Sequence, residues 1–149
     1  MTFENKVIKF AKKKHKGQLD DNKCDYYESH LVNVANILKA SNADEWTVAA
    51  GYLHDVIEDT DTTYKELVSE FGEKIANLVN EVTHEGTKDN IGYYFPRLKT
   101  REGIMIKFAD NLSNLNRMDN YHKERKQHHL KISKFWKSSP DDKRWEKFK

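Results

Sequence analysis

Residues 49–60 read AAGYLHDVIEDT, and this stretch decides the fold that the sequence predicts. At about 100° per residue on a helical wheel, its imidazole and three carboxyl groups share one side while apolar residues gather on the other. These polar residues are His54, Asp55, Glu58 and Asp59. The pattern predicts an amphipathic helix from Glu45 to about Ile57, with Asp44 as its N-cap.

Carboxyl groups this close together repel one another unless a positive charge lies among them, so the acidic side of this helix predicts a bound cation or cationic side chain. Imidazole and carboxylate groups are ligands of divalent metal ions, although a solvated helix surface would also explain the pattern. Further ligands would have to come from other segments. His30 follows a polar loop, and Asp110 lies in an apolar run where an unpaired carboxylate is costly. From the residues alone, His30 could also be a core or capping histidine, and Asp110 could form an internal salt bridge.

Apolar residues recur at helical spacing along most of the chain, and only two prolines and six glycines interrupt them. The expected segments are a helix through residues 7–11 that ends at Gly17, a polar loop over 18–29, a helix over 31–38 closed by Ser41–Asn42, a helix over 61–71 stopped by Gly72, a helix over 75–82, a loop over 83–90, a helix over 100–118 and a basic terminal helix to about Trp136. The predicted fold class is therefore all-α, a compact helical bundle.

Composition narrows the class of protein. The chain has 149 residues, 37% of them hydrophobic, which fits one globular domain. No apolar run approaches the ~18 residues of a membrane span, and the single Cys24 excludes a disulfide framework. The N-terminal residues contain no apolar signal segment, which predicts a cytoplasmic protein without a membrane partner.

The charge is unevenly distributed. Residues 1–116 contain 15 basic and 19 acidic residues, whereas residues 117–149 contain 11 and 5. A basic tail with interleaved aromatic residues could bind nucleic acid. A helix that closes the bundle explains it better, since the tail also has a partial apolar stripe.

Several motifs occur in an order typical of a known family. They are residues 15–18 (HKGQ), 27–31 (YESHL), 49–60, 66–72 (ELVSEFG), 75–83 (IANLVNEVT) and 106–114 (IKFADNLSN). Together they resemble the HD-domain hydrolases, above all the RelA/SpoT type, whose members include guanosine tetraphosphate (ppGpp) 3′-pyrophosphohydrolases. The resemblance implies one HD hydrolase domain over residues 1–149, with 117–149 as a basic terminal helix and tail.

The resemblance also implies roles for individual residues. A divalent metal ion, usually Mn²⁺, would be bound by His30, His54, Asp55 and Asp110. Glu58 and Asp59 would position and deprotonate the attacking water. Lys107 and Asn114 would contact a small-molecule nucleotide substrate.

The chain departs from the family pattern where substrate is expected. Asp20-Asp21 stands where the guanosine tetraphosphate hydrolases carry a basic pair, and Asn111 and Ser113 stand where arginine and histidine are common. An acidic pair cannot stack a flat cation on a base or attract phosphate. The expected function is metal-dependent hydrolysis of a nucleotide phosphate or pyrophosphate ester, with guanosine tetraphosphate as one candidate. The alternatives are an HD phosphohydrolase for a different nucleotide and a non-catalytic module that binds nucleotides or nucleic acid.

Overall fold

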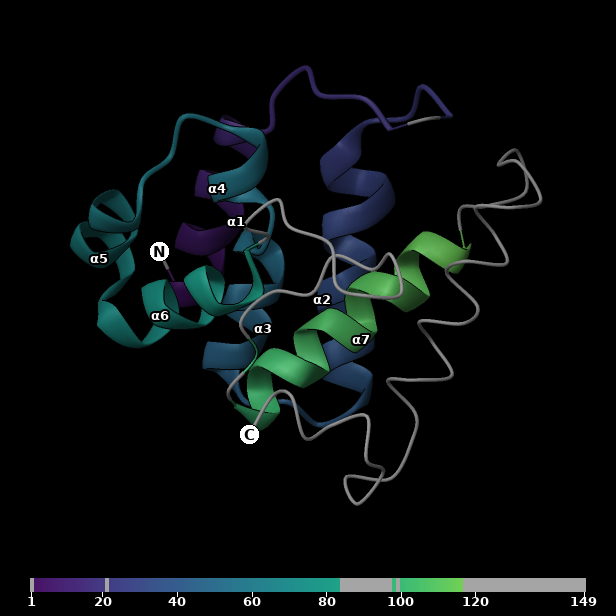
Figure 1. Ribbon diagram of the computed structural model, residues 1–149. Helices are drawn as coiled ribbons and strands as arrows, with labels where there is room; N and C mark the ends of the chain where they lie inside the picture. Colours follow the sequence, from purple (N-terminus) through teal and green to yellow (C-terminus); the bar gives the residue numbers. More distant parts are fainter. Residues whose placement is uncertain (1, 21, 84–97, 99, 117–149) are drawn as a thin grey trace, which may run out of the picture.

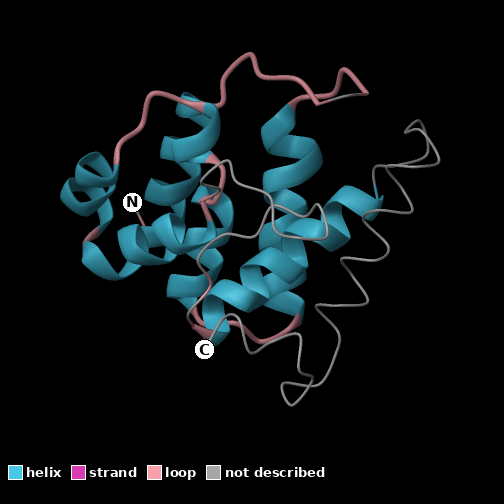
Figure 2. Ribbon diagram, viewed as in Figure 1, coloured by secondary structure: helices cyan, strands magenta, loops and turns pink. Residues whose placement is uncertain are grey.

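The computed structural model describes residues 2–20, 22–83, 98 and 100–116. In this part of the chain every regular element is helical, apart from an isolated bridge between Leu19 and Asp25, so the predicted all-α class is confirmed (Figure 2). The elements are α1 (Phe3–Lys14), the π-helical turn η1 (Tyr27–Leu31), α2 (Val32–Ala40), α3 (Glu45–Leu53), α4 (Val56–Asp59), α5 (Tyr64–Phe71), α6 (Glu73–Val82) and α7 (Arg101–Asn116). None of these helices is long and apolar enough to cross a bilayer.

Local side-chain chemistry sets several helix boundaries. Thr2, Asp44 and Thr63 each accept a hydrogen bond from the backbone N–H three residues ahead, at 2.8 to 3.2 Å. Gly72 separates α5 from α6 with a φ of 91°, a conformation that costs glycine little. The predicted N-cap at Asp44 and the predicted stop at Gly72 are therefore confirmed.

The helix expected to run from Glu45 to about Ile57 is interrupted, so that prediction is wrong. It ends at Leu53, because the His54 ring donates a hydrogen bond to the Gly51 carbonyl at 2.7 Å. A continuing helix would use that carbonyl for its own backbone bond. After two intervening residues, His54 and Asp55, the short helix α4 begins at Val56. His54, Asp55, Glu58 and Asp59 therefore do not lie along one continuous helix, as the helical wheel assumes.

The loop expected over residues 18–29 is also shorter than predicted. Helical structure begins at Tyr26 and continues through η1 into α2, so His30 lies inside a helical segment instead of opening one. Helix α1 ends at Lys14, and Gly17, with a φ of 83°, closes the turn that follows. The predicted terminal helix over residues 117–136 lies outside the described residues.

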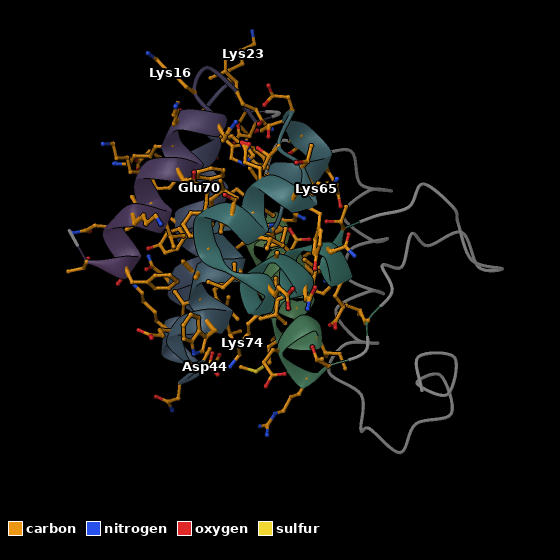
Figure 3. The ribbon with its side chains drawn as sticks, turned by 90° about the vertical axis from the view of Figure 1, so that its left-hand side faces the viewer. Lys16, Lys23, Asp44, Lys65, Glu70 and Lys74 are labelled. Carbon is orange, nitrogen blue, oxygen red and sulfur yellow. The ribbon has the colours of Figure 1, made fainter. Side chains whose placement is uncertain are left out.

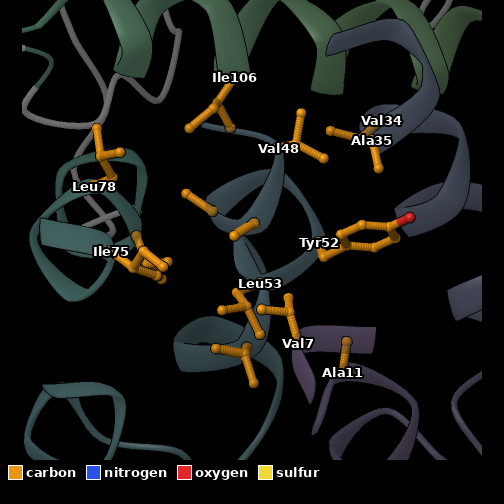
Figure 4. Packing of buried hydrophobic residues seen from close by; sticks show 14 of the residues in the cluster. Val7, Ala11, Val34, Ala35, Val48, Tyr52, Leu53, Ile75, Leu78 and Ile106 are labelled. Atoms are coloured by element: carbon orange, nitrogen blue, oxygen red, sulfur yellow. The ribbon is translucent and has the colours of Figure 1, made fainter. Parts of the chain in front are cut away.

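Helix α3 is the centre of the bundle. Every residue from Thr47 to Leu53 is buried, and α3 packs against α1, α2, α6 and α7. Figure 4 shows apolar side chains of these helices meeting around it. Helix α7 lies across α2 (Figure 1), and charged residues such as Lys65, Glu70 and Lys74 occupy the exposed surface (Figure 3). The core therefore holds the C-terminal end of α3, where His54 follows, in a fixed place.

Close packing at Gly51 leads to a stability prediction. A Cβ atom at this position would lie 2.5 Å from Leu38 Cδ1 and 3.5 Å from Val34 Cγ1, and both neighbours are buried. We expect Gly51→Val to lower the free energy of unfolding by about 2–3 kcal/mol, as overpacked cores do. Urea denaturation measures this change. Asn36→Val on the exposed side of α2 should change it far less, and equal unfolding midpoints for the two variants would contradict the packing.

Candidate metal centre

Four side chains from distant parts of the chain converge at the end of α3. They are His30 from η1, His54 and Asp55 from the junction of α3 and α4, and Asp110 from α7, with one ligand atom of each within 4.8 Å of all the others. The two histidine Nε2 atoms are 3.3 Å apart. Asp110 Oδ1 lies 2.9 Å from His30 Nε2, and Asp55 Oδ2 lies 3.0 Å from His54 Nε2. Two imidazoles and two carboxylates thus face a common point.

The outer nitrogen of each imidazole already has a partner. His54 Nδ1 donates to the Gly51 carbonyl, and His30 Nδ1 lies 2.8 Å from the Ser113 hydroxyl oxygen, which also accepts from the Asn33 amide at 3.1 Å. These contacts turn both Nε2 atoms toward the carboxylates. Metal-binding histidines commonly use their second nitrogen in this way. The donor set therefore fits a divalent cation.

The electrostatics of the cluster favour positive charge at its centre. Both histidine side chains are 1% exposed, and the two carboxyl groups are 12–13% exposed. Burial opposes the charged form of His54, but Asp55 and Asp110 raise its pKa well above the usual value. Burial also opposes the charged form of the two carboxyl groups. The charge of His54 nevertheless holds the pKa of Asp55 well below the usual range, and Lys107 and His54 do the same for the pKa of Asp110. The same negative field would attract a divalent cation.

Lys107 and Asn114, for which the family resemblance implies substrate contacts, both contact Asp110. Lys107 Nζ lies 3.1 Å from Asp110 Oδ2, and the Asn114 amide donates to Oδ1 at 3.4 Å. Burial opposes the charge on Lys107, but Asp110, Asp55 and Glu58 together raise its pKa. Lys107 therefore stays cationic at the edge of the cluster.

Glu58 and Asp59 lie on α4, next to the cluster, and both residues are exposed. Gln18 connects Asp59 to the turn after α1: its amide nitrogen donates to Asp59 Oδ2 at 3.2 Å, and its amide oxygen lies 2.7 Å from His15 Nδ1. Partial desolvation of its carboxyl group, followed by the nearby Asp55 carboxylate, raises the pKa of Asp59. This acidic pair borders the cluster and remains accessible to solvent.

The Asp20 carboxylate is hydrogen-bonded to the backbone of the turn between α1 and η1. Asp20 Oδ1 accepts hydrogen bonds from the backbone N–H groups of Asn22 and Cys24 at 2.8 and 2.9 Å. This carboxylate therefore shapes the turn. Asp21 lies outside the described residues, as does the basic tail over residues 117–149.

The structure adds side chains to the site that the sequence did not indicate. The Tyr26 hydroxyl donates to Asp55 Oδ2 at 2.5 Å, and burial, followed by the Asp55 charge, raises the pKa of Tyr26. Ser113 departs from the family pattern, yet its hydroxyl contacts the His30 ring across 83 positions of sequence. Asn33 reaches the same hydroxyl across 80 positions. Contacts this distant leave no local periodicity by which they could be found.

Comparisons with known proteins identify the family of the chain. A family model described as "HD domain" matches residues 8–91, which is more than half of the chain. The chain belongs to the HD-domain family. The resemblance inferred from the motifs is thus confirmed, and the matched range contains three of the four clustered side chains, His30, His54 and Asp55.

Relatives of this HD domain carry the names of guanosine tetraphosphate hydrolases. It is 37% identical over 118 residues to a guanosine-3′,5′-bis(diphosphate) 3′-pyrophosphohydrolase of Aquifex aeolicus, which covers 74% of this chain and 17% of the relative. It is 32% identical over 117 residues to the 3′-pyrophosphohydrolase MESH1 of Danio rerio, covering 73% of this chain and 65% of the relative. The chain thus spans less than two thirds of each relative.

A solved structure supports the same fold. A metazoan ortholog of SpoT, described as hydrolyzing ppGpp, matches this HD domain with a TM-score of 0.70 and 25% identity. The match covers 87% of this chain and 80% of the other. The predicted helical bundle of the HD type is therefore confirmed.

Proposed function

We propose that this HD domain is a divalent-metal-dependent phosphohydrolase that cleaves a nucleotide phosphate or pyrophosphate ester. The observation that carries the proposal is the convergence of His30, His54, Asp55 and Asp110 on one point beside an accessible acidic pair. The names of the relatives support a substrate of the guanosine tetraphosphate type, cleaved at its 3′-pyrophosphate. We propose Mn²⁺ as the cation, because the family resemblance implies it and carboxylate ligands suit it.

The chemistry divides between the cation and the chain. A divalent cation held by the four side chains would neutralise charge on a phosphate oxygen and make water more acidic. We assign the proton transfer to Glu58, which accepts a proton as the water oxygen bonds to phosphorus. The bond from phosphorus to the ester oxygen breaks, and that oxygen takes up the proton from Glu58 as it leaves, which returns Glu58 to its carboxylate form. Asp59, held by Gln18, orients the same water.

We assign Lys107 and Asn114 to the edge of the substrate site. Their contacts hold the two oxygens of Asp110 separately, which fixes the plane of that carboxylate. Lys107 also brings a positive charge to the border of an acidic centre, where it would attract a phosphate group. Both residues thus support the cation site and the substrate at once.

A different nucleotide is the second candidate substrate, and one observation favours it. Asp20 stands where the guanosine tetraphosphate hydrolases are expected to carry a basic residue, and its carboxylate is engaged with the backbone of its own turn. A carboxylate in this position cannot provide a cation for stacking against guanine. The metal chemistry is the same for either substrate.

A substrate panel tests the proposed function. The purified full chain is incubated with Mn²⁺ and guanosine tetraphosphate, an NADP-type 2′-phosphate or a cyclic nucleotide, and released phosphate and pyrophosphate are measured. We expect hydrolysis of at least one nucleotide, lost with a chelator and restored by Mn²⁺. Turnover that the chelator leaves unchanged would overturn the metal assignment, and binding without any hydrolysis would favour the non-catalytic module.

A further inference from the structure

Tyr26 is fixed in place by the rings around it. It is the first helical residue before η1 and lies one turn ahead of His30. Its ring centroid is 5.2 Å from that of His30 and 5.6 Å from that of His15, and both imidazoles are 1% exposed. Because these two buried imidazoles flank the partly buried Tyr26 ring, packing limits the directions in which its hydroxyl can point.

The hydroxyl of Tyr26 contacts the oxygen of Asp55 that faces the cluster. The distance from this hydroxyl to Asp55 Oδ2 is 2.5 Å, and the same Oδ2 lies 3.0 Å from His54 Nε2 and 3.5 Å from His30 Nε2. A carboxylate only accepts, so the phenol is the donor. A carboxylate oxygen has two lone pairs, so the bond from Tyr26 leaves the second one available to the imidazole contacts or to a cation.

The Asp55 side chain does not cap α4. Asp55 directly precedes α4, but its φ of −101° and ψ of 1° lie outside the extended conformation from which an N-cap side chain usually accepts a hydrogen bond from the first turn of its helix. Asp55 makes no such bond. Its carboxylate points instead to Tyr26 and the two histidines.

We propose that Tyr26 is a positioning residue whose hydroxyl holds the Asp55 carboxylate toward the cation site. The inference rests on the proposed metal centre. It makes the affinity for the cation depend on a side chain that is not itself a ligand. Partners of metal ligands typically change metal affinity by about 10–100-fold when they are removed.

Tyr26→Phe tests this proposal, because it keeps the ring and removes only the hydroxyl. We expect the Kd for Mn²⁺, measured by calorimetric titration of the metal-free full chain, to rise by about 10-fold or more. The Tm of the metal-free chain should change little. Tyr27→Phe is the matched control, because the Tyr27 ring stacks on Tyr52 at 6.3 Å instead of on the histidines, and its Kd should equal that of the native chain.

Two further measurements separate positioning from other roles. Saturating Mn²⁺ should restore hydrolysis by Tyr26→Phe to the native rate. In an Asp55→Asn background, Tyr26→Phe should cause no additional loss of Mn²⁺ affinity, since the two residues act through one contact.

Each outcome has a distinct meaning. If the native chain binds no Mn²⁺, both the proposed function and this inference are wrong. If the native chain binds Mn²⁺ and Tyr26→Phe binds it equally well, only the inference is wrong. If the variant loses affinity but saturating Mn²⁺ does not restore its rate, the hydroxyl acts on the reacting groups and the positioning role is overturned.

Discussion

Asp55→Asn should lower metal-dependent hydrolysis by more than about 100-fold, because it removes a charged ligand and not merely a partner of one. The asparagine side chain has almost the same volume, so the packing around this 13% exposed position is preserved. The amide lacks the negative charge that, with Asp110, opposes burial and raises the pKa of His54. Rates at saturating substrate measure the loss of hydrolysis, and calorimetric titration with Mn²⁺ measures the loss of cation binding.

A matched control distinguishes this effect from a general loss of acidity. Asp61→Asn changes the same type of residue six positions away, where the side chain is 91% exposed and 3.5 Å from Lys14. It should leave both the rate and the affinity for Mn²⁺ unchanged, because exposed ion pairs contribute little. His54→Ala should lose activity as Asp55→Asn does. A fully active, folded Asp55→Asn variant would remove Asp55 from the metal centre.

The helices were predictable where local signals decide them. Asp44 caps α3, and Gly72 ends α5 with a backbone conformation suited to glycine, so both could be identified from neighbouring residues alone. The break after Leu53 could not be predicted in this way. It depends on the His54 ring, which turns back to the Gly51 carbonyl while its other nitrogen is drawn toward Asp55 and Asp110. The spacing of apolar residues along the sequence carries no information about these tertiary contacts.

The candidate site was predictable only in part, for a similar reason. Helical spacing pointed to His54 and Asp55, but the residues alone left His30 and Asp110 with structural alternatives, and the family resemblance was needed to join them. The partners that orient this set come from distant segments: Tyr26 contacts Asp55 across 29 positions, and Ser113 contacts His30 across 83. Ser113 replaces a residue common in the family and still makes a specific contact. A residue that departs from a family motif can therefore still contribute a contact at the site.

Glu58→Gln should reduce hydrolysis by about 100-fold or more while Mn²⁺ binding is retained, as expected when a general base is lost. Glutamine keeps the length and shape of the side chain but accepts a proton far less readily. Glu58 is exposed on α4 and is one of the carboxylates that raise the pKa of Lys107, which locates its charge near the cluster. Single-turnover rates and Mn²⁺ titration of the same preparation measure chemistry and cation binding separately.

Glu58→Gln and Asp55→Asn should give different results, because Asp55 is proposed to bind the cation and Glu58 to accept a proton from water. Loss of a ligand should weaken Mn²⁺ binding and rate together, whereas loss of the base should lower the rate alone. Glu70→Gln, an exposed glutamate on α5, is the control and should retain full activity. An equal loss of Mn²⁺ affinity in Glu58→Gln would make Glu58 a ligand. An unchanged rate would exclude it from the reaction and leave Asp59 as the acidic side chain able to accept the proton.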